Sequence, residues 1–212
     1  MRIGVLGAGR IVEALVPHWT RAGHDVMLSG RTPEKAAALA GRLGVRVGTP
    51  REAARFGDVV LLAVLYQGID ATLEAAGAGD GVLAGKVLID CNNPVEVEDF
   101  TLVDDFTPSL AEYLAATTGA RVVKALHQVH ADVWEHSVRF AGRALAVPMA
   151  GEAEAKETVA ELVRDAGAEP IDAGELAQAR NLEAMTAVII RLLWRGADPR
   201  SAFQLTVGSA VG

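Results

Sequence analysis

The chain has 212 residues, 50% of them hydrophobic, with 22 glycines and a formal net charge of −7 at pH 7. A chain of this length can bury one substantial core and has room for a small second lobe. The negative charge and the lack of a basic cluster argue against a nucleic-acid-binding or membrane-surface protein, and no apolar run approaches the roughly 20 residues that a membrane span requires.

The first ten residues, MRIGVLGAGR, predict a strand, a tight turn and the start of a helix. Gly7 suits the turn because glycine accepts positive φ, and Gly9 lets a pyrophosphate approach the backbone. The amides that open the next helix, expected over residues 11–22, then face the anion. A flexible turn alone would explain a lone GxG, but the strand before it and the helix after it favour a dinucleotide site.

Two features of this first helix depart from the usual dinucleotide fingerprint. Val12 stands three residues after Gly9, where a glycine or alanine lets helix and strand pack closely. Pro17 removes one hydrogen bond inside the helix, which typically costs about 3 kcal/mol unless the helix kinks. We therefore expect a bent first helix that keeps the phosphate site.

The second strand, expected over residues 25–28, ends in Ser29, Gly30, Arg31 and Thr32. Here dinucleotide folds meet the adenosine ribose, where an acid bonds a free 2′-hydroxyl and an arginine accommodates a 2′-phosphate. The chain has no acid at this point, so Arg31 and two hydroxyls predict NADP, with a desolvated Arg31 that needs the phosphate as its partner. Thr32 is also the expected N-cap of a helix over residues 33–43, and both roles can hold together.

A continuous apolar run at residues 58–64 predicts a central parallel strand that is buried on both faces. A short strand at residues 45–47 and a helix at residues 50–56 precede it. The carboxyl end of such a strand borders the ligand crevice, so Leu65 and Tyr66 should flank a cofactor. For Tyr66 the alternative is packing against the helix that follows.

The strand expected at residues 86–90 leads into Asn93, which precedes a proline and should therefore be extended. At this edge of the sheet the Asn93 amide is placed to meet a nicotinamide. The alternative is a turn in which Asn93 bonds only its own backbone. The acidic residues 95–108 predict a surface loop or lid.

A further strand, expected at residues 121–126, leads into His127 and His130. Two histidines suggest a metal site, but no cysteine or carboxylate cluster completes a tetrahedral set, so we expect no metal. We expect both histidines to contact a substrate or second cofactor. Packing histidines with satisfied hydrogen bonds are the alternative.

The C-terminal part predicts a strand at residues 143–147, a helix at 152–166, a strand at 168–172 and helix from residue 174. The last helix is apolar on more than one face, which predicts a homodimer contact at residues 182–194, or else a wholly intramolecular core helix. The expected fold is α/β, a Rossmann-type doubly wound, mostly parallel sheet with a small C-terminal helical portion. Residues 1–175 form the NADP-binding domain, in which 121–141 contribute to the substrate cleft, and residues 176–212 complete that cleft.

Several stretches together resemble the F420-dependent NADP oxidoreductases and their relatives, including the reductase domain of the STEAP metalloreductases. These stretches are GAGRIVEAL, SGRTPEKA, DVVLLAV, VVKALHQV and IDAGELAQARNLEAM. The resemblance implies a deazaflavin or flavin ring stacked over the nicotinamide near His127. It also implies NADP contacts from Gly7, Gly9, Arg10, Ile11, Ser29, Arg31 and Thr32, with the nicotinamide near Val64, Leu65 and Asn93. The chain departs from this family after His127, where QVHADVW replaces an expected proline-containing loop.

The expected function is hydride transfer between NADP(H) and F420 or, failing that, a flavin such as FMN. Such transfer needs chiefly alignment of two cofactors, and His127 would bond the acceptor ring as that ring gains negative charge. One alternative is an NADPH-dependent reductase of a small imine or carbonyl, with Tyr66, Lys124, His127 and His130 as candidate proton donors. The other is a non-catalytic NADPH-sensing module.

We expect a cytoplasmic location and no nucleic-acid or membrane partner. Cys91 is the single cysteine, which excludes an intrachain disulfide and is typical of a reducing compartment. The chain begins directly with a predicted core strand, which leaves no room for a signal peptide.

Overall fold

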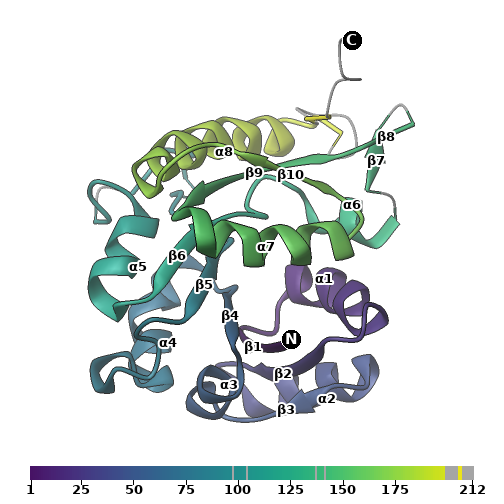
Figure 1. The fold of residues 1–212 in the computed structure, drawn as a ribbon. Helices are drawn as coiled ribbons and strands as arrows, with labels where there is room; N and C mark the ends of the chain where they lie inside the picture. Colours follow the sequence, from purple (N-terminus) through teal and green to yellow (C-terminus); the bar gives the residue numbers. More distant parts are fainter. Residues whose placement is uncertain (97, 104, 137, 141, 199–204, 207–212) are drawn as a thin grey trace.

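The computed structural model describes residues 1–96, 98–103, 105–136, 138–140, 142–198 and 205–206. Within these residues an eight-stranded sheet carries helices on both faces (Figure 1). The strand order is β10-β9-β6-β5-β4-β1-β2-β3. From β3 to β6 this is the order of doubly wound dinucleotide-binding folds, which confirms the expected fold class.

The N-terminal half alternates strands and helices as the sequence predicts. All neighbouring strands from β3 to β6 pair in parallel. These strands are β1 (Arg2–Leu6), β2 (Asp25–Ser29), β3 (Arg46–Val47), β4 (Val59–Leu62), β5 (Val87–Asp90) and β6 (Arg121–Lys124). The connecting helices are α1 (Arg10–Arg21), α2 (Pro33–Leu43), α3 (Pro50–Phe56), α4 (Ile69–Ala76) and α5 (Leu110–Thr118), with short turns of 3₁₀-helix η1 (Tyr66–Gly68) and η2 (Ala78–Asp80).

The C-terminal half differs from the expectation in its short elements. The single strand expected at residues 143–147 is wrong: β8 (Arg143–Ala144) pairs with β7 (Arg139–Phe140) in a separate hairpin, and β9 (Ala146–Gly151) is a new strand. β9 runs antiparallel to β6, and β10 (Glu169–Asp172) runs parallel to β9. The helices of this half are α6 (Ala131–His136), α7 (Ala153–Asp165) and α8 (Ala179–Trp194), with η3 (Leu176–Gln178) before α8.

Side chains alternate across the central strands and build one core on each face of the sheet. Val59 and Leu61 of β4 belong to the core that includes residues of α1, α2 and α7. Val60 and Leu62 belong to the core that includes residues of α3, α4 and α5. This period of two buries β4 completely, as its apolar sequence predicts.

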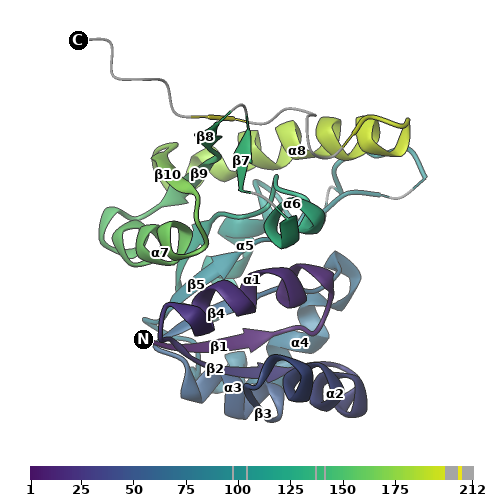
Figure 2. The ribbon, with the colours of Figure 1, turned by 90° about the vertical axis from the view of Figure 1, so that its right-hand side faces the viewer.

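Helix α1 continues through Pro17, and Val12 lies in the core with no exposed surface. The bend expected from these two residues remains a prediction. Helix α8 lies at the end of the molecule remote from α2 and β3, as both ribbon views show (Figure 2). No helix among the described residues is long and apolar enough to span a membrane.

Candidate functional site

The carboxyl ends of five parallel strands form one row across the sheet. The register pairs Leu6 with both Ser29 and Leu62, Leu62 with Asp90, and Asp90 with Lys124. The segments that follow these residues therefore emerge at one edge, where ligands bind in open α/β sheets. All the site residues predicted from the sequence lie on these segments.

The turn after β1 has the features of a pyrophosphate cradle. Gly7 has φ of +143°, and a Cβ there would lie 2.1 Å from the Ala63 carbonyl oxygen, so the turn requires glycine. Gly9 precedes α1 as its N-cap, and no side chain caps the helix. A Cβ at Gly9 would meet nothing within 4 Å, which leaves open space before the first amides of α1. These amides, Ile11 among them, are suitably placed to donate to an anion.

The end of β2 offers a free cation beside this cradle. Arg31 is exposed and has no hydrogen bond or ion pair with any described residue. The expectation of a desolvated Arg31 is therefore wrong, because the side chain is exposed. Thr32 is the N-cap of α2, but its hydroxyl makes no capping bond and remains available. Ser29 is fully buried, and its hydroxyl donates to the Val5 carbonyl oxygen at 2.9 Å.

Arg10, at the start of α1, makes ion pairs with α6. Its Nη2 lies 2.6 Å from Asp132 Oδ1 and 3.5 Å from Glu135 Oε2. Helix α6 is held on α1 by a second contact, between His18 Nε2 and the Trp134 carbonyl oxygen at 2.9 Å. Arg10 thus joins the phosphate cradle to a short acidic helix that the sequence pattern did not predict.

The segment after β4 presents an apolar surface at the same edge. Leu65 is 80% exposed, an unusual position for a leucine directly after a fully buried strand. Tyr66 donates its hydroxyl to Glu96 Oε1 at 2.8 Å, which raises the pKa of the phenol, and its ring packs edge-on against Phe106. Leu65 is therefore open to a ligand, whereas the Tyr66 hydroxyl is bonded to the acidic loop.

Asn93 and His127 are joined at the next two strand ends. Asn93 Nδ2 donates to the His127 carbonyl oxygen at 2.9 Å, and Asn93 Oδ1 is buried without a partner among the described residues. Both ring nitrogens of His127 are likewise buried and without a hydrogen-bond partner there. Burial and then the nearby Lys124 ammonium hold the pKa of His127 well below its ordinary value, so the imidazole is neutral.

His130 has a structural position at the start of α6. Its Nδ1 accepts from the Asp132 amide at 3.3 Å, and its carbonyl oxygen accepts from the Val133 amide at 3.0 Å. The ring is exposed rather than directed into the sheet edge with His127. The structure therefore does not bring the two histidines together.

A buried ionic group lies directly beneath this edge. The Lys124 ammonium lies 2.9 Å from Asp90 Oδ2 and 3.2 Å from Glu183 Oε1, and it donates to the Asn92 carbonyl oxygen at 2.6 Å. Burial alone would lower the pKa of Lys124, but the two carboxylates outweigh it and raise that pKa. Burial raises the pKa of Glu183. Sequence analysis missed Asp90 and Glu183, although a charged residue within an apolar strand or helix is a signal for such a partner.

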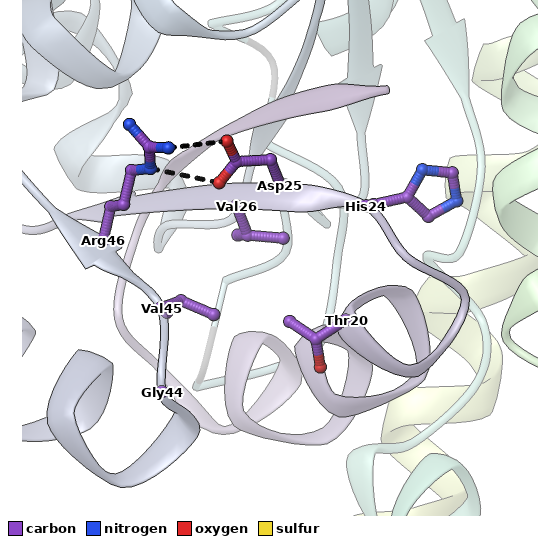
Figure 3. Close-up of a pocket in the computed structure, with 7 residues that line it drawn as sticks. All are labelled: Thr20, His24, Asp25, Val26, Gly44, Val45 and Arg46. Carbon is purple, nitrogen blue, oxygen red and sulfur yellow. Dashed lines mark hydrogen bonds and ion pairs between the residues drawn. The ribbon is translucent and has the colours of Figure 1, made fainter.

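A separate pocket of about 460 Å³ lies where β2 begins, away from the carboxyl edge (Figure 3). Two of the residues that line it, Arg46 and Asp25, form an ion pair with 2.9 Å between Arg46 Nη2 and Asp25 Oδ2. Its lining residues are Thr20, His24, Asp25, Val26, Gly44, Val45 and Arg46. Because it opens at the amino end of β2, we do not assign the nucleotide to it.

The described residues contain one group of three potential metal ligands, His24, Glu161 and Asp165. His24 Nδ1 lies 3.0 Å from the Met1 ammonium, which can only donate. His24 Nδ1 must therefore accept, and Nε2 must carry the hydrogen that it donates to Asp165 Oδ2 at 2.7 Å. Since the nitrogen that faces the carboxylates has no free lone pair, this group does not suit a metal.

Comparisons with known proteins agree with the sequence resemblance. Residues 2–94 match the family described as "NADP oxidoreductase coenzyme F420-dependent". The metalloreductase STEAP3 of Rattus norvegicus is 33% identical over 193 residues, which are 91% of this chain and 37% of that protein. The F420-dependent NADP reductase of Methanothermobacter marburgensis is 28% identical over 221 aligned positions, 91% of this chain and 92% of the reductase. The chain thus spans little more than a third of STEAP3 but nearly the whole archaeal enzyme.

Solved structures support the same fold. A crystal structure from Arthrobacter sp. FB24, proposed to be an F420-dependent NADP reductase, has a TM-score of 0.84 and 29% identity, and the match covers 98% of this chain and 99% of that one. An imine reductase from Myxococcus stipitatus in complex with NADP⁺ has a TM-score of 0.69 and 22% identity, with 92% and 63% coverage. The second likeness shows the fold alone.

Proposed function

The chain is a relative of the F420-dependent NADP oxidoreductases and the STEAP metalloreductases, and on this premise we propose that it transfers hydride between NADP(H) and a deazaflavin such as F420, or else a flavin such as FMN. The observation that carries the nucleotide half of this proposal is an exposed Arg31, with no partner among the residues that the structure describes, beside an α1 N-terminus that no side chain caps. A 2′-phosphate would satisfy the guanidinium, and a pyrophosphate would satisfy the first amides of α1. We also propose contacts from Gly7, Gly9, Ile11 and the Thr32 hydroxyl.

The second half of the proposal, hydride transfer to an acceptor ring, is supported by the residues that follow β4. The exposed Leu65 follows Val64, and the Val64 amide is bonded to Asn92, the neighbour of Asn93 in the chain. These residues offer an apolar surface with one amide, which suits a nicotinamide ring. When NADPH is bound, it supplies the hydride, and the chain must hold the two rings in contact and exclude water. We place the acceptor ring near Tyr66 and His127, with His130 at the margin, directly before α6.

His127 is proposed as a neutral hydrogen-bonding partner of the acceptor ring. Its low pKa means that it stabilises the reduced ring through a hydrogen bond rather than through a full positive charge. Because both ring nitrogens are buried, the surroundings of His127 must open before it can make that bond. Replacing His127 with alanine should slow transfer and leave NADPH affinity nearly unchanged, because the nucleotide is held at β1 and β2.

An acceptor panel distinguishes this function from its alternatives. NADPH is incubated with the protein and F420, FMN, FAD, a cyclic imine or a small ketone, and its absorbance is followed. Oxidation by F420 or a flavin supports the proposal. Oxidation only by the imine or ketone would replace it with the small-substrate reductase. NADPH binding without oxidation by any acceptor would favour a sensing module.

Two further expectations remain predictions. The cytoplasmic location is one, and it is compatible with a buried free thiol whose pKa burial raises to about 12. The homodimer is the other, and the residues of α8 that support it are Val188, 54% exposed, and Trp194, 69% exposed. The proposed division into residues 1–175 and 176–212 also remains a prediction.

A further inference from the structure

The proposed function assigns no role to the buried ionic group of Lys124, Asp90 and Glu183 beneath the sheet edge. Lys124 and Asp90 have fully buried side chains, and the Glu183 side chain is 4% exposed. Replacing buried ion pairs with apolar side chains of similar volume is often neutral or stabilising, so stability alone is a weak explanation for such a group. The hydrogen bonds of this buried ionic group indicate a role other than stability.

These hydrogen bonds lead directly to the residues proposed to border the nicotinamide. Lys124 Nζ holds the Asn92 carbonyl oxygen, and Asp90 Oδ1 accepts from both the backbone amide and Nδ2 of Asn92, at 3.0 and 2.8 Å. Asn92 Oδ1 then accepts from the Val64 amide at 2.9 Å. The ends of β4, β5 and β6 are thus fixed relative to one another by directional bonds, which an apolar side chain could not supply.

Glu183 connects the same group to two helices. Its carboxylate accepts from the Leu110 and Ala111 amides at 3.2 and 3.4 Å, at the N-terminus of α5, while it faces Lys124 from α8. Negative charge at a helix N-terminus is favourable, so Glu183 has two separate stabilising contacts. Through them α8 is anchored to the catalytic edge rather than only to the outer layer.

We propose that Lys124 is a positioning residue for the nicotinamide: through Asp90 and Asn92 it fixes Val64 and Asn93 at the edge where the ring lies, and through Glu183 it ties that edge to α8. The inference rests on the proposed function for the location of the ring. The proposed role of Lys124 is to align the nicotinamide ring. Loss of Lys124 should therefore release the nicotinamide end of NADPH while the phosphates stay bound. Misplacement by about 1 Å can cost a hundredfold in rate.

The test compares Lys124→Met with a matched control, Lys156→Met. Lys156 is also a buried lysine that donates to a carboxylate, Asp172, and to a carbonyl oxygen, that of Gly174. It lies on α7, however, and contacts the end of β10 and the residues directly after it. NADPH affinity is measured by titration, and the mobility of the bound ring by the anisotropy decay of nicotinamide fluorescence. This second readout needs no acceptor. The side-specificity of deuteride transfer from 4R- and 4S-labelled NADPH is measured with F420.

We expect Lys124→Met to bind NADPH within about threefold of wild type, with a mobile ring, loss of side-specificity and hydride transfer roughly a hundredfold slower. Lys156→Met should match wild type in all of these. A rigid ring and unchanged transfer in Lys124→Met would overturn the inference, as would equal losses in Lys156→Met. If wild type transfers no hydride, the proposed function fails, while the anisotropy result still decides the positioning role.

Lys124→Met leaves two carboxylates buried together, and breaking a buried pair is strongly destabilising. If Lys124→Met does not fold, the same measurements on Asp90→Asn test the inference. This variant keeps the Lys124–Glu183 pair and nearly the same shape but removes the charge that binds Lys124 and Asn92. Asp90→Asn should change ring mobility, side-specificity and transfer rate in the same directions as Lys124→Met, but by less. Wild-type ring mobility in folded Asp90→Asn would contradict the inference.

Discussion

At the scale of single residues, the site depends on groups that lack partners. Arg31 is an exposed cation that pairs with none of the described residues. His127 is a neutral, buried imidazole, and neither of its ring nitrogens has a hydrogen-bond partner in that part of the chain. These are opposite situations. Water already satisfies Arg31, so it gains from a phosphate only the strength of charge-assisted bonds, whereas His127 has an unmet hydrogen-bonding capacity inside the protein.

Arg31→Ala should abolish most of the preference for NADPH over NADH. Hydrogen bonds to charged groups contribute about 1.5–3 kcal/mol, so the NADPH dissociation constant should rise roughly 10- to 100-fold. The NADH constant should change little, because that nucleotide has no 2′-phosphate. Titration of both nucleotides into both proteins tests this, and equal affinities of wild type for the two would refute the assignment of Arg31.

His127 should make stability depend on pH in a defined direction. In the unfolded chain a histidine takes up a proton near pH 6.5, but the folded pKa lies well below that value. The unfolded state therefore binds more protons in this window, and stability falls as pH drops from about 6.5 toward the folded pKa. The variant His127→Gln should not show this fall in stability, because glutamine does not take up a proton.

Urea unfolding at about pH 7.5 and pH 5 measures the effect. The free energy of unfolding of wild type should fall by up to about 2 kcal/mol more than that of His127→Gln, since one proton changes stability by about 1.4 kcal/mol per pH unit. Parallel losses in the two proteins would show that His127 titrates normally.

At the scale of elements, α6 controls the surroundings of the phosphate cradle. Asp132 and Glu135 bind Arg10, the residue that the family resemblance assigns to NADP. In the proposed complex these carboxylates would compete with a phosphate for the same guanidinium. They would also bring negative charge close to the proposed pyrophosphate position.

Asp132→Asn should consequently bind NADPH more tightly than wild type. Exposed ion pairs contribute about 0.2–1 kcal/mol, so the expected gain is roughly 1.4- to 5-fold at low salt, and it should disappear at high salt. Glu74→Gln, an exposed acid in the last turn of α4, serves as the control for a simple change in net charge. Weaker binding by Asp132→Asn would show that the Arg10–Asp132 contact supports the site instead of competing with it.

The elements also show what the sequence can and cannot predict. The strands β1, β2, β4 and β5 and their helices follow from local patterns, because each has its own apolar run and turn. Helix α6 and the β7–β8 hairpin are too short to show a periodicity, and β9 begins within an apolar stretch that gives no sign of reversed direction. The bonds of Lys124 were not predictable because Asp90 and Glu183 lie 34 and 59 positions away, and only the topology brings them together.

At the scale of the whole molecule, α8 combines a buried charged contact with an exposed apolar surface. Glu183 faces the sheet, while Val188 and Trp194 face outward, and Trp194 packs against Phe100 of the acidic loop at a centroid distance of 5.8 Å. A second copy that covered this surface would lie next to the loop beside the proposed acceptor site.

Val188→Asp should therefore convert a dimer into a monomer. Light scattering at micromolar concentration should give twice the chain mass for wild type and the single mass for the variant, because a charge at an apolar interface is costly to bury. NADPH affinity should not change, since Val188 is exposed and lies on the outer side of α8 rather than toward Lys124. A monomeric wild type would remove the dimer prediction.

The central claim, direct hydride transfer between NADPH and a deazaflavin, is tested most directly by isotope tracing. NADPH that carries deuterium at the transferred position is incubated with the protein and F420, and the reduced F420 is analysed by mass spectrometry. We predict that the deuterium is found on carbon in the reduced F420, and that in the reverse direction NADP⁺ recovers it from the labelled product. Reduced F420 without deuterium, or no reduction of F420 while an imine or ketone becomes labelled, would contradict the account.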